Sequence, residues 1–141
     1  MLRKLGIDTH GVEISKYAIS RVGLETQPYI HHGDINNLPF PDKSFDLVTT
    51  FDVLEHVSTE NLERATFECN RVARRLVLHK MFTVENTWIR KLHEPDLSHV
   101  SVYGRSWWEK FWKEHGYKLA KIFYPHLPYW METLFLLEKK K

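Results

Sequence analysis

Apolar positions recur along the chain with two different periods, and the segments of each kind alternate. Short apolar runs rich in β-branched and aromatic residues predict four strands, over 7–14, 29–32, 45–51 and 75–80. Between them, apolar residues three and four apart predict a helix over 15–23, capped by Ser15, and another over 59–73, capped by Ser58. Strands that alternate with helices are typical of an α/β fold with a mostly parallel sheet.

The C-terminal third has a different pattern. Ser106 and Glu109 predict a capping box for a helix over 107–115, which ends at Gly116. Beyond it, two apolar runs around a proline-containing loop predict an antiparallel hairpin, over 117–124 and 129–138. Two further short helical segments are expected, over 1–5 before Gly6 and over 86–93.

An acidic residue stands at the end of three predicted strands. Glu13 ends the first strand, Asp34 follows the second, and Asp52 comes directly after the strand 45–51. The carboxyl ends of parallel strands form one edge of an open α/β sheet, and ligands bind in the crevice outside that edge. The sequence therefore predicts a ligand site among these acids.

A series of short motifs joins these strand ends. In order, the motifs are Gly33-Asp34, Leu38-Pro39-Phe40-Pro41-Asp42, Ser44-Phe45-Asp46 and Asp52-Val53-Leu54-Glu55-His56-Val57. The series resembles the S-adenosylmethionine-dependent methyltransferases with a Rossmann-like fold, a class that includes the ubiquinone and menaquinone biosynthesis enzymes. With its flanks, the resemblance covers most of 5–137. It implies a single minimal methyltransferase domain over 1–141, whose mostly parallel sheet ends in the C-terminal antiparallel hairpin.

One departure from the family pattern is large. The glycine-rich loop and the first strand, which in the family precede the helix ending here at Gly6, are absent, so we expect a sheet truncated at its N-terminus. In the family that strand is central, between the strands that here end in Glu13 and Phe51. Because buried unpaired backbone groups are costly, three answers are open: the flanking strands pair directly, a second copy fills the gap, or the first part belongs to a separate or longer chain.

The resemblance implies that S-adenosylmethionine is the cofactor and that the strand ends hold it. Glu13 would accept hydrogen bonds from the ribose hydroxyls, and Asp34 from the exocyclic amine of the adenine. The other implied contacts are Ile14 and Ile35 beside the adenine, with Phe51 and Asp52 beside the methionine part. The alternative interpretations are a solvated acid before a helix for Glu13 and an ordinary turn aspartate for Asp34.

The acceptor side is expected just beyond the central strand, where the resemblance places Glu55, His56 and His99. His56 is the best candidate for a general base, because an imidazole pKa can lie near neutrality. The alternative is a loop histidine that bonds to the backbone. The sequence shows no group that would orient His56, and many methyl transfers need only proximity and alignment. We therefore expect an auxiliary role for it.

Composition excludes several classes of protein. The 141 residues suggest one domain, and the net charge of +2 does not indicate a nucleic-acid partner. No apolar run approaches the ~20 residues of a membrane span, and the first residues lack the apolar core of a signal peptide. The single cysteine fits a reducing compartment. We expect a soluble, cytoplasmic protein, with no membrane partner and, since the histidines lack metal-ligand spacing, no metal site.

The function expected from these observations is S-adenosylmethionine-dependent methyl transfer to an acceptor that the sequence does not identify. The alternative is a non-catalytic methyltransferase-like module for binding or dimerisation, or one part of a split enzyme. A homodimer is expected, because a lost central strand leaves an open edge. Its expected surfaces are the edge near 7–14 and the aromatic helix 107–115, although such aromatic residues are more often core or interface than a stacking platform. The basic cluster at 71–80 is interpreted as a solvated helix face.

Overall fold

The computed structural model describes residues 2–84, 98–123 and 132–138, and this part of the chain forms two β-sheets. In the smaller sheet, β1 (Gly11–Glu13) is parallel to β2 (Ile30–His32). The larger sheet has the order β3-β4-β6-β5, with bounds Phe45–Phe51, Ala73–Phe82, Glu132–Glu138 and Lys118–Phe123. β3 is parallel to β4, whereas β6 is antiparallel to both β4 and β5. The predicted mixed α/β fold is confirmed.

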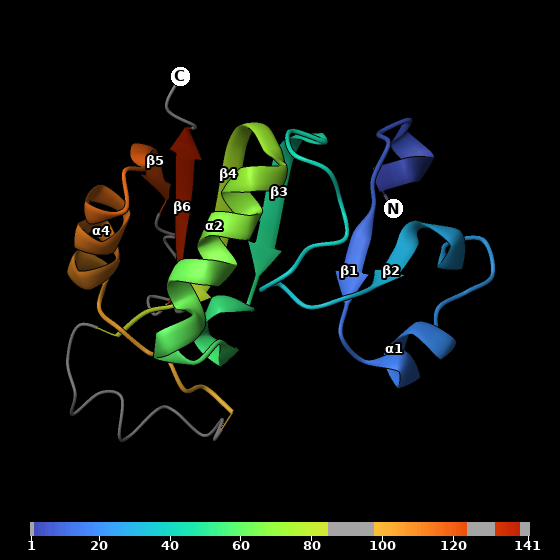
Figure 1. The fold of residues 1–141 in the computed structure, drawn as a ribbon, viewed down its shortest axis with the longest axis horizontal. Coiled ribbons are helices and arrows are strands. Elements are labelled where there is room, and N and C mark those ends of the chain that lie inside the picture. Colours follow the sequence, from blue (N-terminus) through green and yellow to red (C-terminus); the bar gives the residue numbers. More distant parts are fainter. Residues whose placement is uncertain (1, 85–97, 124–131, 139–141) are drawn as a thin grey trace.

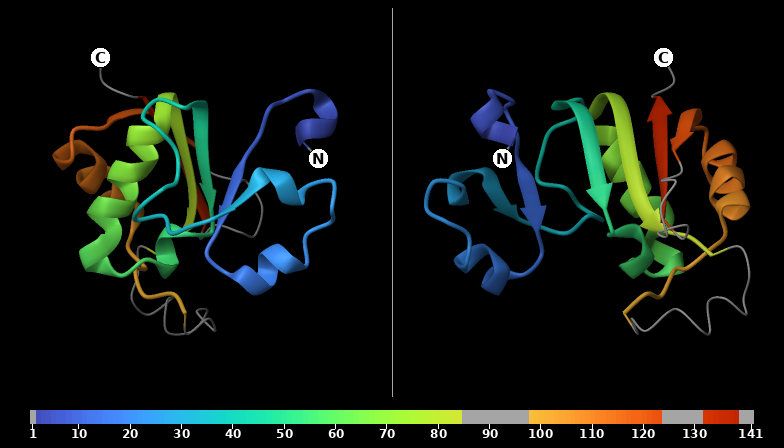
Figure 2. Two further views of the ribbon diagram at one scale, coloured as in Figure 1. Left: turned by 45° about the vertical axis from the view of Figure 1, so that its right-hand side comes forward. Right: turned by 180° about the vertical axis from the view of Figure 1, so that it is seen from behind.

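The two sheets lie side by side but share no strand pair in the described residues. β1 and β3 run in the same direction in every view of Figures 1 and 2. However, β1 pairs only with β2, and β3 pairs only with β4, among the described strands. The edge of β1 that faces β3, and the edge of β3 that faces β1, therefore have no described strand partner. Direct pairing of the strands that end in Glu13 and Phe51, one of the three answers above, is therefore wrong.

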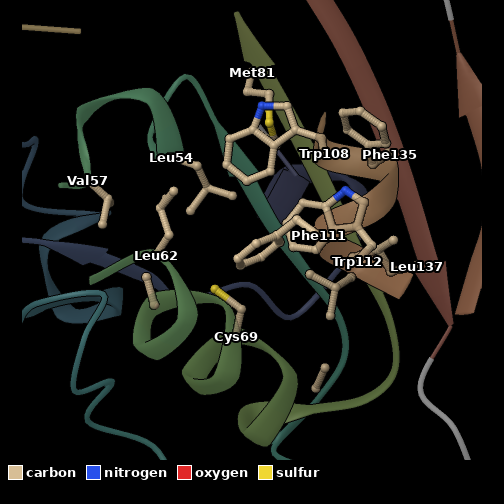
Figure 3. Packing of buried hydrophobic residues seen from close by; sticks show 13 residues of the cluster. Leu54, Val57, Leu62, Cys69, Met81, Trp108, Phe111, Trp112, Phe135 and Leu137 are labelled. Carbon is tan, nitrogen blue, oxygen red and sulfur yellow. The ribbon is translucent and has the colours of Figure 1, made fainter. Parts of the chain in front are cut away.

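Two helices cover one face of the larger sheet. α2 (Leu62–Val72) and α4 (Arg105–Glu114) lie on the same side of β3, β4 and β6 (Figure 2). The buried apolar residues of α2 recur at helical spacing and face the sheet, as an amphipathic helix requires: Leu62, Ala65, Cys69 and Val72. Figure 3 shows how side chains of this helix meet those of β4, β6 and α4 in one core.

α4 supplies the aromatic part of this core. Trp108 and Trp112 are fully buried, and Phe111 is nearly so (Figure 3). The ring of Trp112 stacks on His79 of β4 with centroids 5.1 Å apart and approaches Phe135 of β6. The apolar face of this helix is thus buried in the core of the chain, which confirms the interpretation of these aromatic residues as core. Of the two expected dimer surfaces, the region near β1 is the one that keeps large exposed apolar side chains: Ile7, Ile14 and Tyr17.

His79 is a buried polar residue in the middle of this core. It has no exposed surface, and its Nδ1 lies 2.7 Å from the Thr50 hydroxyl. Burial lowers the pKa of His79 to about 3, because a charged imidazolium would lose its hydration there. The residue is therefore neutral in the folded protein over the whole physiological range.

Local signals at element ends are confirmed where a short side chain or a glycine decides the geometry. The Ser15 hydroxyl accepts a hydrogen bond from the Ala18 N–H at 3.1 Å and caps α1 (Lys16–Ser20). Gly6 follows the 3-10 helix η1 (Leu2–Leu5), Gly116 follows α4, and both have φ of +78°. This left-handed conformation favours glycine and ends a helix.

Other local predictions are wrong. The capping box of Ser106 and Glu109 does not form, because α4 begins at Arg105, after Gly104, and Glu109 instead pairs with Arg105 at 3.5 Å. Ser58 makes no capping hydrogen bond, and 3-10 helix η4 (Thr59–Asn61) precedes α2. Strand β1 is shorter than the predicted 7–14, β4 extends beyond the predicted 75–80, and 3-10 helix η2 (Gln27–Tyr29) includes the predicted first residue of β2. The predicted helix 86–93 and hairpin loop lie outside the described residues.

A buried ion pair fixes the loop between β2 and β3. The Glu68 carboxylate, on α2 and 2% exposed, accepts the Leu38 N–H at 2.9 Å and two hydrogen bonds from Arg71 at 2.8 Å. Arg71 also donates to the carbonyls of Leu38 and Phe40 and to Asp42. The interpretation of Arg71 as part of a solvated helix face is wrong: its guanidinium holds the proline-containing loop on the helix.

Candidate functional site

The three acids predicted at strand ends occupy those positions in the structure. Glu13 is the last residue of β1 and is half-buried. One of its carboxylate oxygens accepts the Ser15 N–H at 2.7 Å, which holds the side chain at the turn into α1. Its second oxygen makes no hydrogen bond within the described residues and can accept one from a ligand.

Asp34 follows β2 after Gly33 and begins a close turn, in which the Asn37 N–H donates to the Asp34 carbonyl at 2.9 Å. One of its carboxylate oxygens accepts hydrogen bonds from the backbone N–H and side-chain amide of Asn36, at 2.8 and 3.0 Å. At Gly33, a Cβ atom would lie 3.1 Å from Val12 and 3.2 Å from Pro39, so glycine permits the close packing of this turn on β1. The two apolar residues predicted beside the acids differ in exposure. Ile14 is 66% exposed, whereas Ile35 is half-buried against the core.

Phe51 and Asp52 end the central strand in an unusual backbone conformation. Asp52 has φ of +53°, a conformation that non-glycine residues rarely adopt and that is often found at functional sites. Both of its carboxylate oxygens lie 2.9 Å from the Lys80 Nζ on the neighbouring strand. Phe51 keeps 52% of its surface exposed. Sequence reasoning did not find Lys80 as the partner of Asp52, which follows from the β3–β4 register.

Glu55 lies behind this edge, in the 3-10 helix η3 (Leu54–His56), and is 1% exposed. One carboxylate oxygen accepts the Phe82 N–H at 3.1 Å, and its main-chain carbonyl accepts the N–H groups of Val100 and Ser101 at 2.8 and 2.9 Å. The other carboxylate oxygen has no hydrogen-bond partner in the described residues. Glu55 thus joins the end of β4 to the segment that precedes α4.

The structure brings together His56 and His99, the two histidines that the resemblance assigns to the acceptor side. Their ring centroids are 4.7 Å apart in an edge-to-face arrangement, and the His99 ring also lies 5.5 Å from Phe82. His56 Nδ1 lies 3.2 Å from the Ser98 carbonyl and 3.0 Å from the Ser98 hydroxyl. Sequence reasoning missed Ser98 and Phe82, because contacts between residues so far apart in the chain have no local signal.

A cavity of about 440 Å³ lies elsewhere, at the amino ends of the strands, and none of the predicted site residues lines it. The lining residues are Asp8, His10, His31, Phe40, Ser44, Phe45 and Asp46. His10 Nδ1 and His31 Nε2 are 3.0 Å apart and satisfy each other. Within the described ranges, no group of three or more His, Cys, Asp or Glu side chains could hold a metal ion, and no helix is long and apolar enough to cross a membrane.

Comparison with known proteins decides the family. Residues 1–76, which include Glu13, Asp34 and Asp52, match the family described as methyltransferase domain. The chain belongs to this methyltransferase family. No curated protein sequence matches it.

Solved structures share the methyltransferase fold at low sequence identity. The PH0226 protein of Pyrococcus horikoshii OT3 is 20% identical with a TM-score of 0.79, over 99% of this chain and 74% of that one. A SAM-dependent methyltransferase of Archaeoglobus fulgidus is 14% identical with a TM-score of 0.79, over 97% and 78%. Magnesium protoporphyrin IX methyltransferase of Synechocystis PCC 6803, solved with bound SAH, is 16% identical with a TM-score of 0.76, over 99% and 67%.

Proposed function

We propose that this methyltransferase domain binds S-adenosylmethionine at the carboxyl ends of β1, β2 and β3 and transfers its methyl group to an acceptor beside His56. The observation that carries the proposal is the series of acids Glu13, Asp34 and Asp52, one at or just beyond the carboxyl end of each of these strands, in a chain of the methyltransferase family. When bound, S-adenosylmethionine supplies an electrophilic methyl group on a positively charged sulfur.

The residues present fit such a ligand. Glu13 and Asp34 each use one carboxylate oxygen to order the turn that follows, and the other oxygen makes no hydrogen bond within the described residues. Two free acceptors on adjacent strands suit ribose hydroxyls and an adenine amine. The exposed side chain of Ile14 and the half-buried Ile35 offer apolar surface for the adenine ring. Phe51 and the Asp52–Lys80 pair then lie toward the methionine part.

Glu55, His56 and His99 are assigned to the acceptor side in this proposal. His56 and His99 form its surface, and the buried Glu55 holds the backbone of the two segments that carry them. Methyl transfer needs close approach and alignment of the nucleophile with the methyl group. Because the segments that carry His56 and His99 are fixed to each other, the surface that they form is suited to position an acceptor.

Calorimetric titration with S-adenosylhomocysteine tests the proposal. The wild-type protein should bind it, and Glu13→Ala should weaken binding by roughly 1–3 kcal/mol, about 5- to 150-fold, because the ribose hydroxyls lose their acceptor. Glu25→Ala is the matched control, since Glu25 is an exposed acid of the same region that does not end a strand. Equal affinities of the wild type and Glu13→Ala would remove Glu13 from the site.

A second function, a non-catalytic module that associates with itself or with a missing part of a split enzyme, is favoured by one observation. The facing edges of β1 and β3 have no described strand partner, and open edges attract a further strand. We propose a homodimer as the form in which this region is covered. A folded protein that dimerises but does not bind S-adenosylhomocysteine would favour this second function over the first.

A further inference from the structure

We propose that His56 is the general base of the transfer, and that the acceptor is a molecule whose nucleophilic atom carries a proton, a hydroxyl or an amine. This inference rests on the proposed function. The sequence offered no group to orient His56, which was the reason to expect an auxiliary role. The structure supplies that group in Ser98, 42 residues later in the chain.

The contacts of His56 select one tautomer of its ring. Nδ1 lies 3.2 Å from the Ser98 carbonyl oxygen and 3.0 Å from its hydroxyl oxygen. A carbonyl oxygen can only accept a hydrogen bond, so Nδ1 must carry the proton to satisfy both contacts. In the neutral ring, Nε2 is then the atom with the free electron pair.

Nε2 is available to a ligand. The His56 side chain is exposed, and Nε2 makes no hydrogen bond in the part of the chain that the structure describes. Two sets of contacts hold the His56 ring in place. The His99 ring packs against it, and the segment that carries Ser98 and His99 is fixed by hydrogen bonds from the Val100 and Ser101 N–H groups to the Glu55 carbonyl. The segment that orients His56 is therefore hydrogen-bonded to Glu55, the residue before His56, so the base and its orienting group keep a fixed geometry.

The step balances as a simple displacement. The acceptor oxygen or nitrogen forms a bond to the methyl carbon, and the carbon–sulfur bond breaks with its electron pair going to sulfur. The acceptor proton passes to Nε2 of His56, which becomes an imidazolium and later releases the proton to water. A thiolate or another nucleophile that is already ionised needs no such group. A fixed base is therefore useful only for an acceptor that enters with its proton.

Nuclear magnetic resonance of protein with ¹⁵N-labelled histidine tests the arrangement without any substrate. The signals of His56 are assigned by their loss in His56→Gln. The spectrum of the neutral ring should show Nδ1 protonated and Nε2 unprotonated. A protonated Nε2 with a bare Nδ1, or an even mixture of the two forms, would overturn the proposal.

A matched pair of probes then tests the chemistry. Phenol enters as a protonated hydroxyl, whereas thiophenol at pH 8 is already ionised. His56→Gln should lower methyl transfer to phenol by ~100-fold or more, and lower transfer to thiophenol far less, because a thiolate needs no base and loses only the contact with the ring. His115→Gln is the control, because the ring of His115 also contacts a backbone carbonyl, that of Phe111, but on α4. It should alter neither rate.

Other outcomes contradict the assignment. Equal losses with both probes would show that His56 has a structural role only, and wild-type transfer to thiophenol but not to phenol would exclude activation of a hydroxyl. Transfer to neither probe, by a protein that binds S-adenosylhomocysteine, would overturn the acceptor class while leaving the proposed cofactor site intact. Absence of S-adenosylhomocysteine binding would instead overturn the proposed function itself, and this inference with it.

Discussion

Arg71→Ala should be among the most damaging single substitutions on α2, because it removes the partner of a buried charge. Glu68 is 2% exposed, and Arg71 provides two of its three hydrogen bonds, each 2.8 Å long. The Arg71 guanidinium holds the pKa of the Glu68 carboxyl below its usual value. Breaking a buried ion pair from one side costs about 3–5 kcal/mol, since the remaining charge has lost its water and its closest partner. Arg64, 3.8 Å from Glu68, does not replace Arg71, because its side chain is 56% exposed and makes no hydrogen bond to the carboxylate.

The other contacts of Arg71 change this magnitude little. The bond to Asp42, which is 73% exposed, contributes at most about 1 kcal/mol, because water screens and replaces it. The carbonyls of Leu38 and Phe40 can bond to water when the loop is released. Urea unfolding followed by circular dichroism should therefore show a loss of about 3–5 kcal/mol for Arg71→Ala.

Arg74→Ala is the matched control. Arg74 pairs with Asp46 at 2.8 Å, but both side chains are more than half exposed, and such surface pairs contribute about 0–1 kcal/mol. Glu68→Gln combined with Arg71→Ala should recover part of the loss, because the unpaired charge is then gone. A loss below 1 kcal/mol for Arg71→Ala alone, equal to that of Arg74→Ala, would refute the argument that a buried charge is at stake.

Two further predictions concern acid stability and association. Because the folded pKa of His79 is about 3 and the usual value 6.5, the unfolded chain binds a proton between these pH values that the folded chain does not. Unfolding free energy should therefore fall by up to ~1.4 kcal/mol per unit as pH falls from about 6 toward 3, and His79→Leu should reduce this slope; identical slopes for both proteins would contradict it. Sedimentation equilibrium at micromolar concentration should give twice the 16.9 kDa chain mass, whereas a monomer with a concentration-independent melt would exclude the homodimer.

Features set by neighbouring residues could be predicted from the sequence. The central strand 45–51, the Ser15 cap and the glycines that end η1 and α4 depend on periodicity, one short side chain or the freedom of a missing Cβ. The acids at strand ends follow from the same patterns, because a strand boundary and an acidic residue are both visible in the sequence. The placement of Glu13, Asp34 and Asp52 was accessible for this reason.

Features set by contacts between distant segments could not be predicted. The Ser98 carbonyl that orients His56 and the Arg71 contacts to the loop at 38–42 join residues about 30 to 40 positions apart. The capping box at Ser106 failed because Gly104 already has the extended backbone of an N-cap, so the helix begins one residue before Ser106. The burial of Glu55 depends on how β4 and the segment before α4 meet, which a side-chain type does not reveal.

The most direct test of the central claim is an amide correlation spectrum of ¹⁵N-labelled protein, recorded while S-adenosylhomocysteine is added. The proposed site predicts saturable shifts of the amides at 13–14, 34–35 and 51–52, which lie at or just beyond the carboxyl ends of β1, β2 and β3. Amides around the cavity near Asp8 and Phe45, at the opposite ends of the strands, should stay unchanged. No shift at any concentration, or shifts confined to that cavity, would contradict a cofactor site at the carboxyl ends of these strands.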